Sequence, residues 1–64
     1  MLDVTKINIE FIRKRCYIST QKRGNYYTGI AEVKLTGETH ESNYHSSRTK
    51  ARLSVLYLMH GLNY

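Results

Sequence analysis

Three cations at the beginning of a predicted helix are the residues best suited to chemistry in this sequence. They are Arg48, Lys50 and Arg52, and the segment 46–62 that contains them continues with apolar residues at helical spacing. The N-terminal end of a helix carries partial positive charge, so acidic side chains are favoured there and cations are disfavoured. A sequence that places cations there is expected to present them to an anionic ligand.

The composition agrees with an anionic partner. The 64 residues include 10 Lys and Arg against 5 Asp and Glu, which gives a formal net charge of +5. An excess of this size in so short a chain favours a polyanion, with nucleic acid first, and a solvated basic surface is the alternative. The length allows one small domain, 1–64, and the 41% hydrophobic content is typical of a globular chain rather than a disordered one.

Catalysis and metal binding are not expected. The three histidines share no ligand spacing with the single cysteine, Cys16, so neither a metal nor another cofactor is predicted. Glu38, His40 and Glu41 lie close in sequence, which could suit a small nuclease, but polar residues on an edge strand are the commoner explanation. We therefore expect a chain that is not an enzyme.

The sequence also carries no feature that predicts a membrane partner. Its longest apolar run, Val55–Met59, is far too short to span a bilayer, and the first ten residues do not resemble a signal peptide. The lone Cys16 cannot form an internal disulfide, which fits a reducing compartment, so a cytoplasmic location is expected.

The middle of the chain predicts a three-stranded antiparallel sheet. Alternating apolar and polar residues mark the strands, and glycines mark the turns between them. The predicted segments, in order, are strand Cys16–Gln21, turn Lys22–Asn25, strand Tyr26–Leu35, turn Thr36–Gly37 and a polar edge strand Glu38–His45. Within the first turn, Gly24-Asn25 suits a two-residue hairpin connection. The apolar face of the strand 26–35 comprises Tyr27, Ala31, Val33 and Leu35, and Gly29 on this face indicates a bulge or a close approach.

The N-terminal segment fits two structures. As a helix capped by Asp3, it would place Val4, Ile7 and Phe11 on one face. As a strand, Ile7, Ile9 and Phe11 would alternate with polar residues, and the β-branched content favours this interpretation. The sequence leaves the choice between helix and strand open.

The C-terminal helix should have two apolar faces. Ser46 or Ser47 is expected to cap it, and Gly61 to end it. At helical spacing, the stripe expected to face the sheet comprises Ala51, Val55, Leu58, Met59 and Leu62. Leu53, Leu56 and His60 fall roughly opposite, so they need a cover, either a helical N-terminal segment or another subunit, and are candidate protein-interface residues. The predicted fold is α+β.

The helix start and the strand order resemble the double-stranded RNA-binding domain, whose order is α-β-β-β-α. That family begins its second helix with a small residue, two lysines, any residue, alanine and lysine. The segment Ser47–Arg52 matches at Ser47, Arg48, Ala51 and Arg52, whereas Thr49 replaces the second lysine. The family's first inter-strand loop enters the RNA minor groove, and the corresponding turn here is basic and keeps the glycine, but it lacks a histidine and is shorter.

The resemblance implies phosphate contacts from the helix start, a minor-groove contact from the turn, and binding that tolerates sequence and weakens with salt. The nucleic-acid-binding residues it implies are Lys22, Arg23, Asn25, Ser47, Arg48, Thr49, Lys50 and Arg52.

Two other interpretations remain open. Small three-strand DNA-binding domains of phage and transposon integrases have a similar helix start and lack the N-terminal helix, so a strand at 5–12 would favour them. A small phage-type inhibitor or adaptor would instead bind a host protein, or a second copy of the chain, through Leu53 and Leu56.

Overall fold

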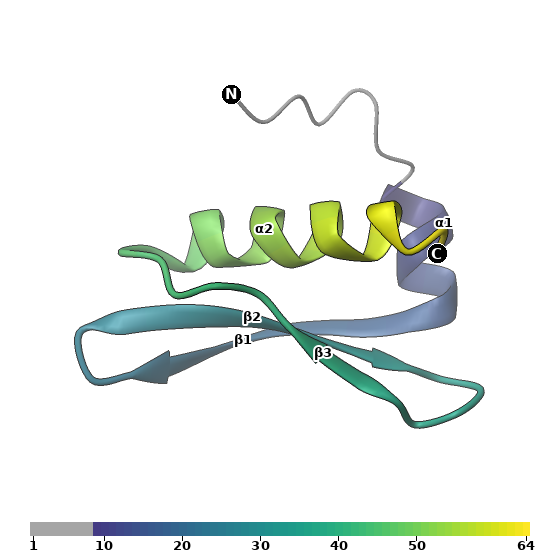
Figure 1. The fold of residues 1–64 in the computed structure, drawn as a ribbon, viewed down its shortest axis with the longest axis horizontal. Coiled ribbons are helices and arrows are strands. Elements are labelled where there is room, and N and C mark those ends of the chain that lie inside the picture. Colours follow the sequence, from purple (N-terminus) through teal and green to yellow (C-terminus); the bar gives the residue numbers. More distant parts are fainter. Residues whose placement is uncertain (1–8) are drawn as a thin grey trace.

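The computed structural model describes residues 9–64, which contain two helices and three strands. Along the chain they are α1 (Ile9–Arg15), β1 (Cys16–Arg23), β2 (Tyr26–Val33), β3 (Thr39–Glu41) and α2 (Arg48–Gly61). The strands form one antiparallel sheet in the order β1-β2-β3, and α2 lies across one face of it (Figure 1). The predicted α+β class is confirmed, and the element order is α-β-β-β-α.

The N-terminal helix resolves the ambiguity of the sequence for the residues that are described. Residues 9–15 are helical, so the strand interpretation is wrong for 9–12, while the predicted cap Asp3 and residues 4–8 lie outside the described residues. Charge favours the helix, because Glu10 lies in its first turn and three cations occupy its last. Burial of Ile12 beneath α2 then outweighs the β-preference of its branched side chain.

The first hairpin has the predicted two-residue turn. Gly24 adopts a φ of +63° and Asn25 completes the turn, the pattern of a type II′ connection with glycine at its first central position. Pairing continues to Arg23 and Tyr26, directly beside the turn. Lys22 and Arg23, which were predicted in the turn, therefore belong to β1, and their side chains leave the sheet on opposite faces.

The second connection is longer than predicted, and the strands on both sides of it are shorter. β2 ends at Val33, and a turn follows in which the Gly37 amide donates to the Val33 carbonyl over 2.7 Å, with Gly37 at a φ of +74°. Leu35, predicted on the apolar face of the strand, lies in this turn and is 93% exposed. After the three residues of β3 the chain leaves the ladder and rejoins it at His45, which exchanges two 2.8 Å backbone bonds with Tyr27.

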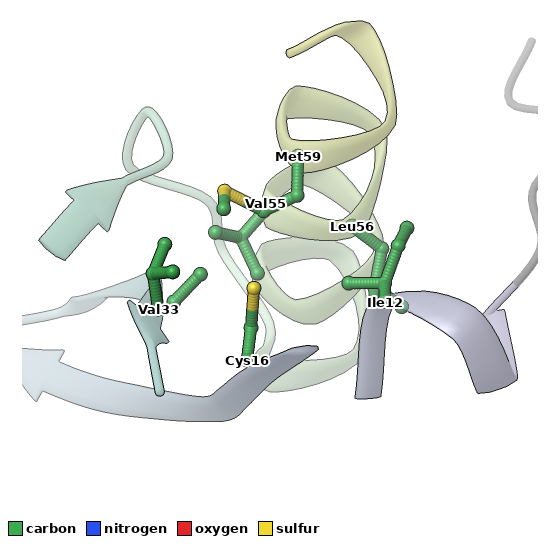
Figure 2. Close-up of a cluster of buried hydrophobic side chains, with 7 residues drawn as sticks. Ile12, Cys16, Val33, Val55, Leu56 and Met59 are labelled. Atoms are coloured by element: carbon green, nitrogen blue, oxygen red, sulfur yellow. The ribbon is translucent and has the colours of Figure 1, made fainter. Parts of the chain in front are cut away.

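The core lies between α2 and the sheet. Three residues of the predicted stripe, Ala51, Val55 and Met59, are fully buried, whereas Leu58 and Leu62 remain partly exposed. Figure 2 shows Val55 and Met59 facing Cys16 and Val33 of the sheet. Burial raises the pKa of the Cys16 thiol. The positive charges of Lys34 and Arg15 lower this pKa by less, so Cys16 packs as a neutral, apolar residue.

The second apolar face of α2 is covered from within the chain. Leu56 is only 4% exposed and belongs to the same core as Ile12 of α1, which lies beside it in Figure 2. The cover that the sequence required is therefore α1. Leu56 is a core residue and does not form part of an open contact surface, which corrects its assignment as an interface candidate.

Both ends of α2 have defined caps. Ser47 is extended, and its hydroxyl oxygen accepts a 3.2 Å hydrogen bond from the Lys50 amide, so Ser47 rather than Ser46 is the N-cap. At the other end Gly61 is the last helical residue, and the left-handed conformation common at helix C-termini is adopted by Asn63, with a φ of +69°. The Tyr64 amide bonds back to the Met59 carbonyl, which completes a Schellman motif.

Replacement of Ser47 by alanine should lower the free energy of unfolding by about 1 kcal/mol, because the Lys50 amide loses its acceptor. In a domain of this size that corresponds to a fall in Tm of roughly 4–8 °C, measurable by circular dichroism. Ser46→Ala is the matched control and should leave Tm within about 2 °C. Equal losses in the two variants would argue against Ser47 as the cap.

Candidate nucleic-acid interface

The start of α2 and the β1–β2 hairpin lie at the same end of the molecule (Figure 1). Arg48 joins them: its Nη1 donates to Thr20 Oγ1 over 3.3 Å, and its Cζ lies 5.1 Å from the centroid of the Tyr27 ring. Lys22 pairs with Tyr27 across the hairpin and shares this face of the sheet with Thr20. The fold therefore brings the cation of the hairpin to the side occupied by the helix start.

The cations at this end are not neutralised by carboxylates of the described chain. The first turn of α2 contains no acidic residue, and the ion pairs recorded in residues 9–64 are Arg23–Glu41 and His40–Glu38. All four cations concerned, Lys22, Arg48, Lys50 and Arg52, are exposed. We call these four residues the basic end. Its positive charge is available to an anion from outside.

The backbone adds donors at the same place. The first amides of a helix have no carbonyl partner within the helix. In α2 the Lys50 amide is satisfied by Ser47, and the Ala51 amide bonds to the Ser47 carbonyl over 3.1 Å. This leaves the amides of Arg48 and Thr49 directed toward an incoming acceptor, a common arrangement for holding phosphate oxygens.

Arg23 lies apart from the basic end. Its side chain leaves the opposite face of the sheet, where Nη2 lies 2.6 Å from Glu41 Oε1 and 3.0 Å from Gln21 Oε1, and Nη1 lies 3.4 Å from the Tyr44 hydroxyl. The hydrogen bond to Tyr44, together with the charge of Glu41, raises the pKa of Arg23 further above its ordinary value. Arg23 thus completes a polar cluster over the open face, and the structure does not bring it to the other predicted contacts.

The remaining predicted residues are distributed between the hairpin and the helix. Asn25 is exposed at the tip of the turn. Arg48, Thr49, Arg52 and Leu53 line a shallow hollow on one side of α2, in which Leu53 is half-buried. His60 is exposed about two turns beyond Leu53 along α2, and Leu56 is buried, so Leu53, Leu56 and His60 do not make one surface.

Thr20 and Tyr27 are the positions of the candidate site that the sequence interpretation missed. They hold Arg48 against the hairpin by a hydrogen bond and by contact with an aromatic face. Their pairing positions could have been derived from the turn, because a two-residue connection at Gly24–Asn25 places Lys22 opposite Tyr27. Their contact with Arg48 could not, since it depends on where α2 crosses the sheet.

The described residues contain neither a metal-binding cluster nor a membrane-spanning helix. No group of three His, Cys, Asp or Glu side chains gathers within residues 9–64 in a way that could hold a metal ion. Neither α1 nor α2, the helices in that range, is long and apolar enough to cross a membrane.

Comparisons of the chain with family models, with curated proteins and with solved structures find no match.

Proposed function

We propose that this chain binds nucleic acid without catalysing a reaction, and that its preferred ligand is double-stranded RNA. The observation that carries the proposal is the basic end, four exposed cations on α2 and the hairpin with no carboxylate partner in residues 9–64. Arg48 holds the helix start and the hairpin at a fixed separation through Thr20 and Tyr27.

Phosphate is the anion that this arrangement suits best. A guanidinium carries five N–H donors, and Arg48 uses one of them on Thr20, so it keeps donors for the oxygens of a phosphate. Arg52 follows one helical turn later, and the exposed amides of Arg48 and Thr49 face the same approach. Successive phosphates along a backbone could therefore be bound by one helix start.

A duplex fits better than a single strand at this end. The helix start and the hairpin tip are two separate contacts, and neither presents an exposed aromatic ring on the helix side that could stack a base: Tyr27 is half-buried beneath Arg48. Contacts of this kind read the width of a groove rather than base edges, which is how double-stranded RNA is recognised. The α-β-β-β-α order and the basic start of α2 support the double-stranded RNA-binding resemblance.

The integrase interpretation has less support. It required an N-terminal strand and no first helix, and residues 9–15 are helical and cover Leu56. The open face of the sheet, which such a domain would place in the major groove of DNA, carries Glu32 and the Arg23–Glu41 ion pair, so the charge of Arg23 is already partnered. Duplex DNA remains the comparison ligand for the test.

The test is a comparison of one sequence in three forms, by fluorescence anisotropy. A blunt RNA duplex of about 20 base pairs should bind at least ~10-fold more tightly than the DNA duplex or the single-stranded RNA. The logarithm of the association constant should fall with the logarithm of salt concentration with a slope of about −3 or steeper, because several phosphates release counterions. Equal affinity for the DNA duplex would replace RNA by DNA as the ligand, and no binding to any form would refute the proposal.

A further inference from the structure

The end of the molecule opposite the basic end carries a groove that the proposed function does not use. Figure 1 shows α1, the β2–β3 turn and the C-terminus together at this end. We call it the terminal groove. The residues that line it are Lys14, Arg15, Val33, Lys34, Leu35, Leu62, Asn63 and Tyr64.

The floor of the terminal groove is apolar and open to solvent. Leu35 is 93% exposed at the apex of a turn that is otherwise polar, and Leu62 is 45% exposed beside it. Complete burial of a leucine side chain stabilises a complex substantially, so two neighbouring exposed leucines are an unused source of binding energy. An apolar side chain of a ligand would find both in one hollow.

The charged side chains at the rim of the terminal groove are all cations. Lys14, Arg15 and Lys34 line it, and none of them forms an ion pair within residues 9–64. The Arg15 guanidinium lies 4.7 Å from the Phe11 ring centroid and the Lys34 ammonium 4.8 Å from that of Tyr17. Such contacts hold the cations in position without neutralising them, because an aromatic ring carries no net charge.

The walls of the groove are formed before any ligand arrives. The Lys34 amide donates to the Arg15 carbonyl over 2.9 Å, which fixes the end of α1 against the end of β2. The C-terminal wall is held by Asn63 in its left-handed conformation and by the Tyr64 amide bond to Met59. A preformed site loses little conformational entropy on binding.

We propose that the terminal groove docks a segment of another protein in which apolar side chains alternate with acidic ones. The leucines would receive the apolar side chain, and the three rim cations would pair with flanking carboxylates. Charge complementarity selects this partner: the charged side chains that line the groove are all cations, which attract an acidic segment and repel a second copy of this chain, whose net charge is +5.

The proposal does not depend on the proposed function. The 14-residue helix α2 separates the basic end from the terminal groove by about 21 Å. A ligand at one end therefore leaves the other accessible. A chain with both properties would tether a protein with an acidic segment to a nucleic acid.

The test uses the full chain labelled with nitrogen-15 and two synthetic peptides, one alternating Glu and Leu and the other alternating Glu and Ser. The Glu-Leu peptide should shift the amide resonances of Lys34, Leu35 and Asn63. The Glu-Ser peptide should bind at least ~10-fold more weakly, because it lacks the apolar side chain. Leu35→Ser should weaken the Glu-Leu peptide by a similar factor, and since Leu35 is exposed the variant should keep its fold.

Two charge-matched double variants separate this proposal from the nucleic-acid one. Lys14→Ala with Lys34→Ala should weaken peptide binding and leave RNA binding within about twofold, whereas Lys22→Ala with Lys50→Ala should do the reverse. Equal binding of the two peptides, or shifts confined to the start of α2, would overturn the proposal. Concentration-dependent shifts of the groove amides without peptide would assign the groove to self-association, and shifts there on adding duplex RNA would assign it to nucleic acid; either result overturns the proposal as well.

Discussion

Replacement of Gly29 by alanine is expected to lower the free energy of unfolding by about 3 kcal/mol, at the upper end of what overpacking usually costs. Gly29 lies on β2 where α2 crosses the sheet. A Cβ built there would overlap the Ala51 carbonyl oxygen and come within 2.8 Å of Val55 Cβ. The first of these is a backbone atom, so no side-chain rotation relieves the clash, and α2 would have to move off the sheet.

Such a loss would be decisive for a chain of this size. Small domains have free energies of unfolding near the bottom of a range of roughly 5–15 kcal/mol, so the Gly29→Ala variant should show a large fall in its urea midpoint. Gly61→Ala is the matched control, because a Cβ at Gly61 meets nothing within 4 Å and its φ is not positive. The control should be neutral or slightly stabilising, since alanine favours the helix. A Gly29→Ala variant as stable as the original chain would show that α2 does not approach β2 this closely.

The elements that the sequence predicts well are those decided by neighbouring residues. The hairpin turn depends on Gly24 and Asn25 alone, and the structure places it there. The buried side of α2 follows from the spacing of Ala51, Val55 and Met59, and all three are fully buried. Gly29 was also recognised as a point of bulge or close approach, because a glycine interrupts the apolar face of an otherwise regular strand.

The elements that the sequence predicts poorly are those decided by contacts between distant residues. Ile9 and Ile12 favour a strand by local preference, but Ile12 gains more by burial against Leu56, a residue over 40 positions away. The same contact converts Leu56 from a predicted surface residue into a core residue. Leu35 differs from its prediction for the opposite reason: the turn after Val33 begins earlier than the alternation suggests, so it lies outside the ladder.

The candidate interface divides in the same way. The cations of the helix start follow from the sequence, because a helix exposes residues that its apolar stripe does not include. The face of the sheet on which Lys22 and Arg23 lie depends on where the strand ends, because neighbouring residues of a strand point to opposite faces. Lys22 lies on the face that carries the basic end, and Arg23 pairs with Glu41 on the open face. A predicted turn that included both residues concealed this difference.

Substitution of Arg48 and Arg52 by alanine in one variant is expected to weaken binding of duplex RNA by about 100-fold. Each charge-assisted hydrogen bond contributes roughly 1.5 kcal/mol or more, and two such losses correspond to about two powers of ten in affinity. The slope of the logarithm of the association constant against the logarithm of salt concentration should also fall by about 2, because two phosphate contacts are lost. Fluorescence anisotropy at three salt concentrations gives both quantities.

A matched variant distinguishes a positioned contact from general attraction to a basic chain. Arg13→Ala with Lys14→Ala removes the same net charge from α1, at the far end of the molecule from the helix start. It should weaken RNA binding by no more than about twofold and change the salt slope by less than one, because long-range attraction is screened beyond roughly 10 Å. Equal effects of the two double variants would indicate that RNA binds the net charge rather than a site.

The Arg48→Ala, Arg52→Ala variant, together with Leu53→Glu, also decides between RNA and a protein ligand at the basic end. Arg48 contacts Thr20 and Tyr27, so its loss could loosen the hairpin, and a thermal melt of each variant must show that the fold is retained. Given a retained fold, an unchanged biological activity in the Arg48→Ala, Arg52→Ala variant would remove phosphate as the ligand of these residues. If Leu53→Glu then abolished that activity, the hollow beside Arg52 would be a protein contact, because a half-buried leucine contributes to an apolar interface and nothing to a phosphate one.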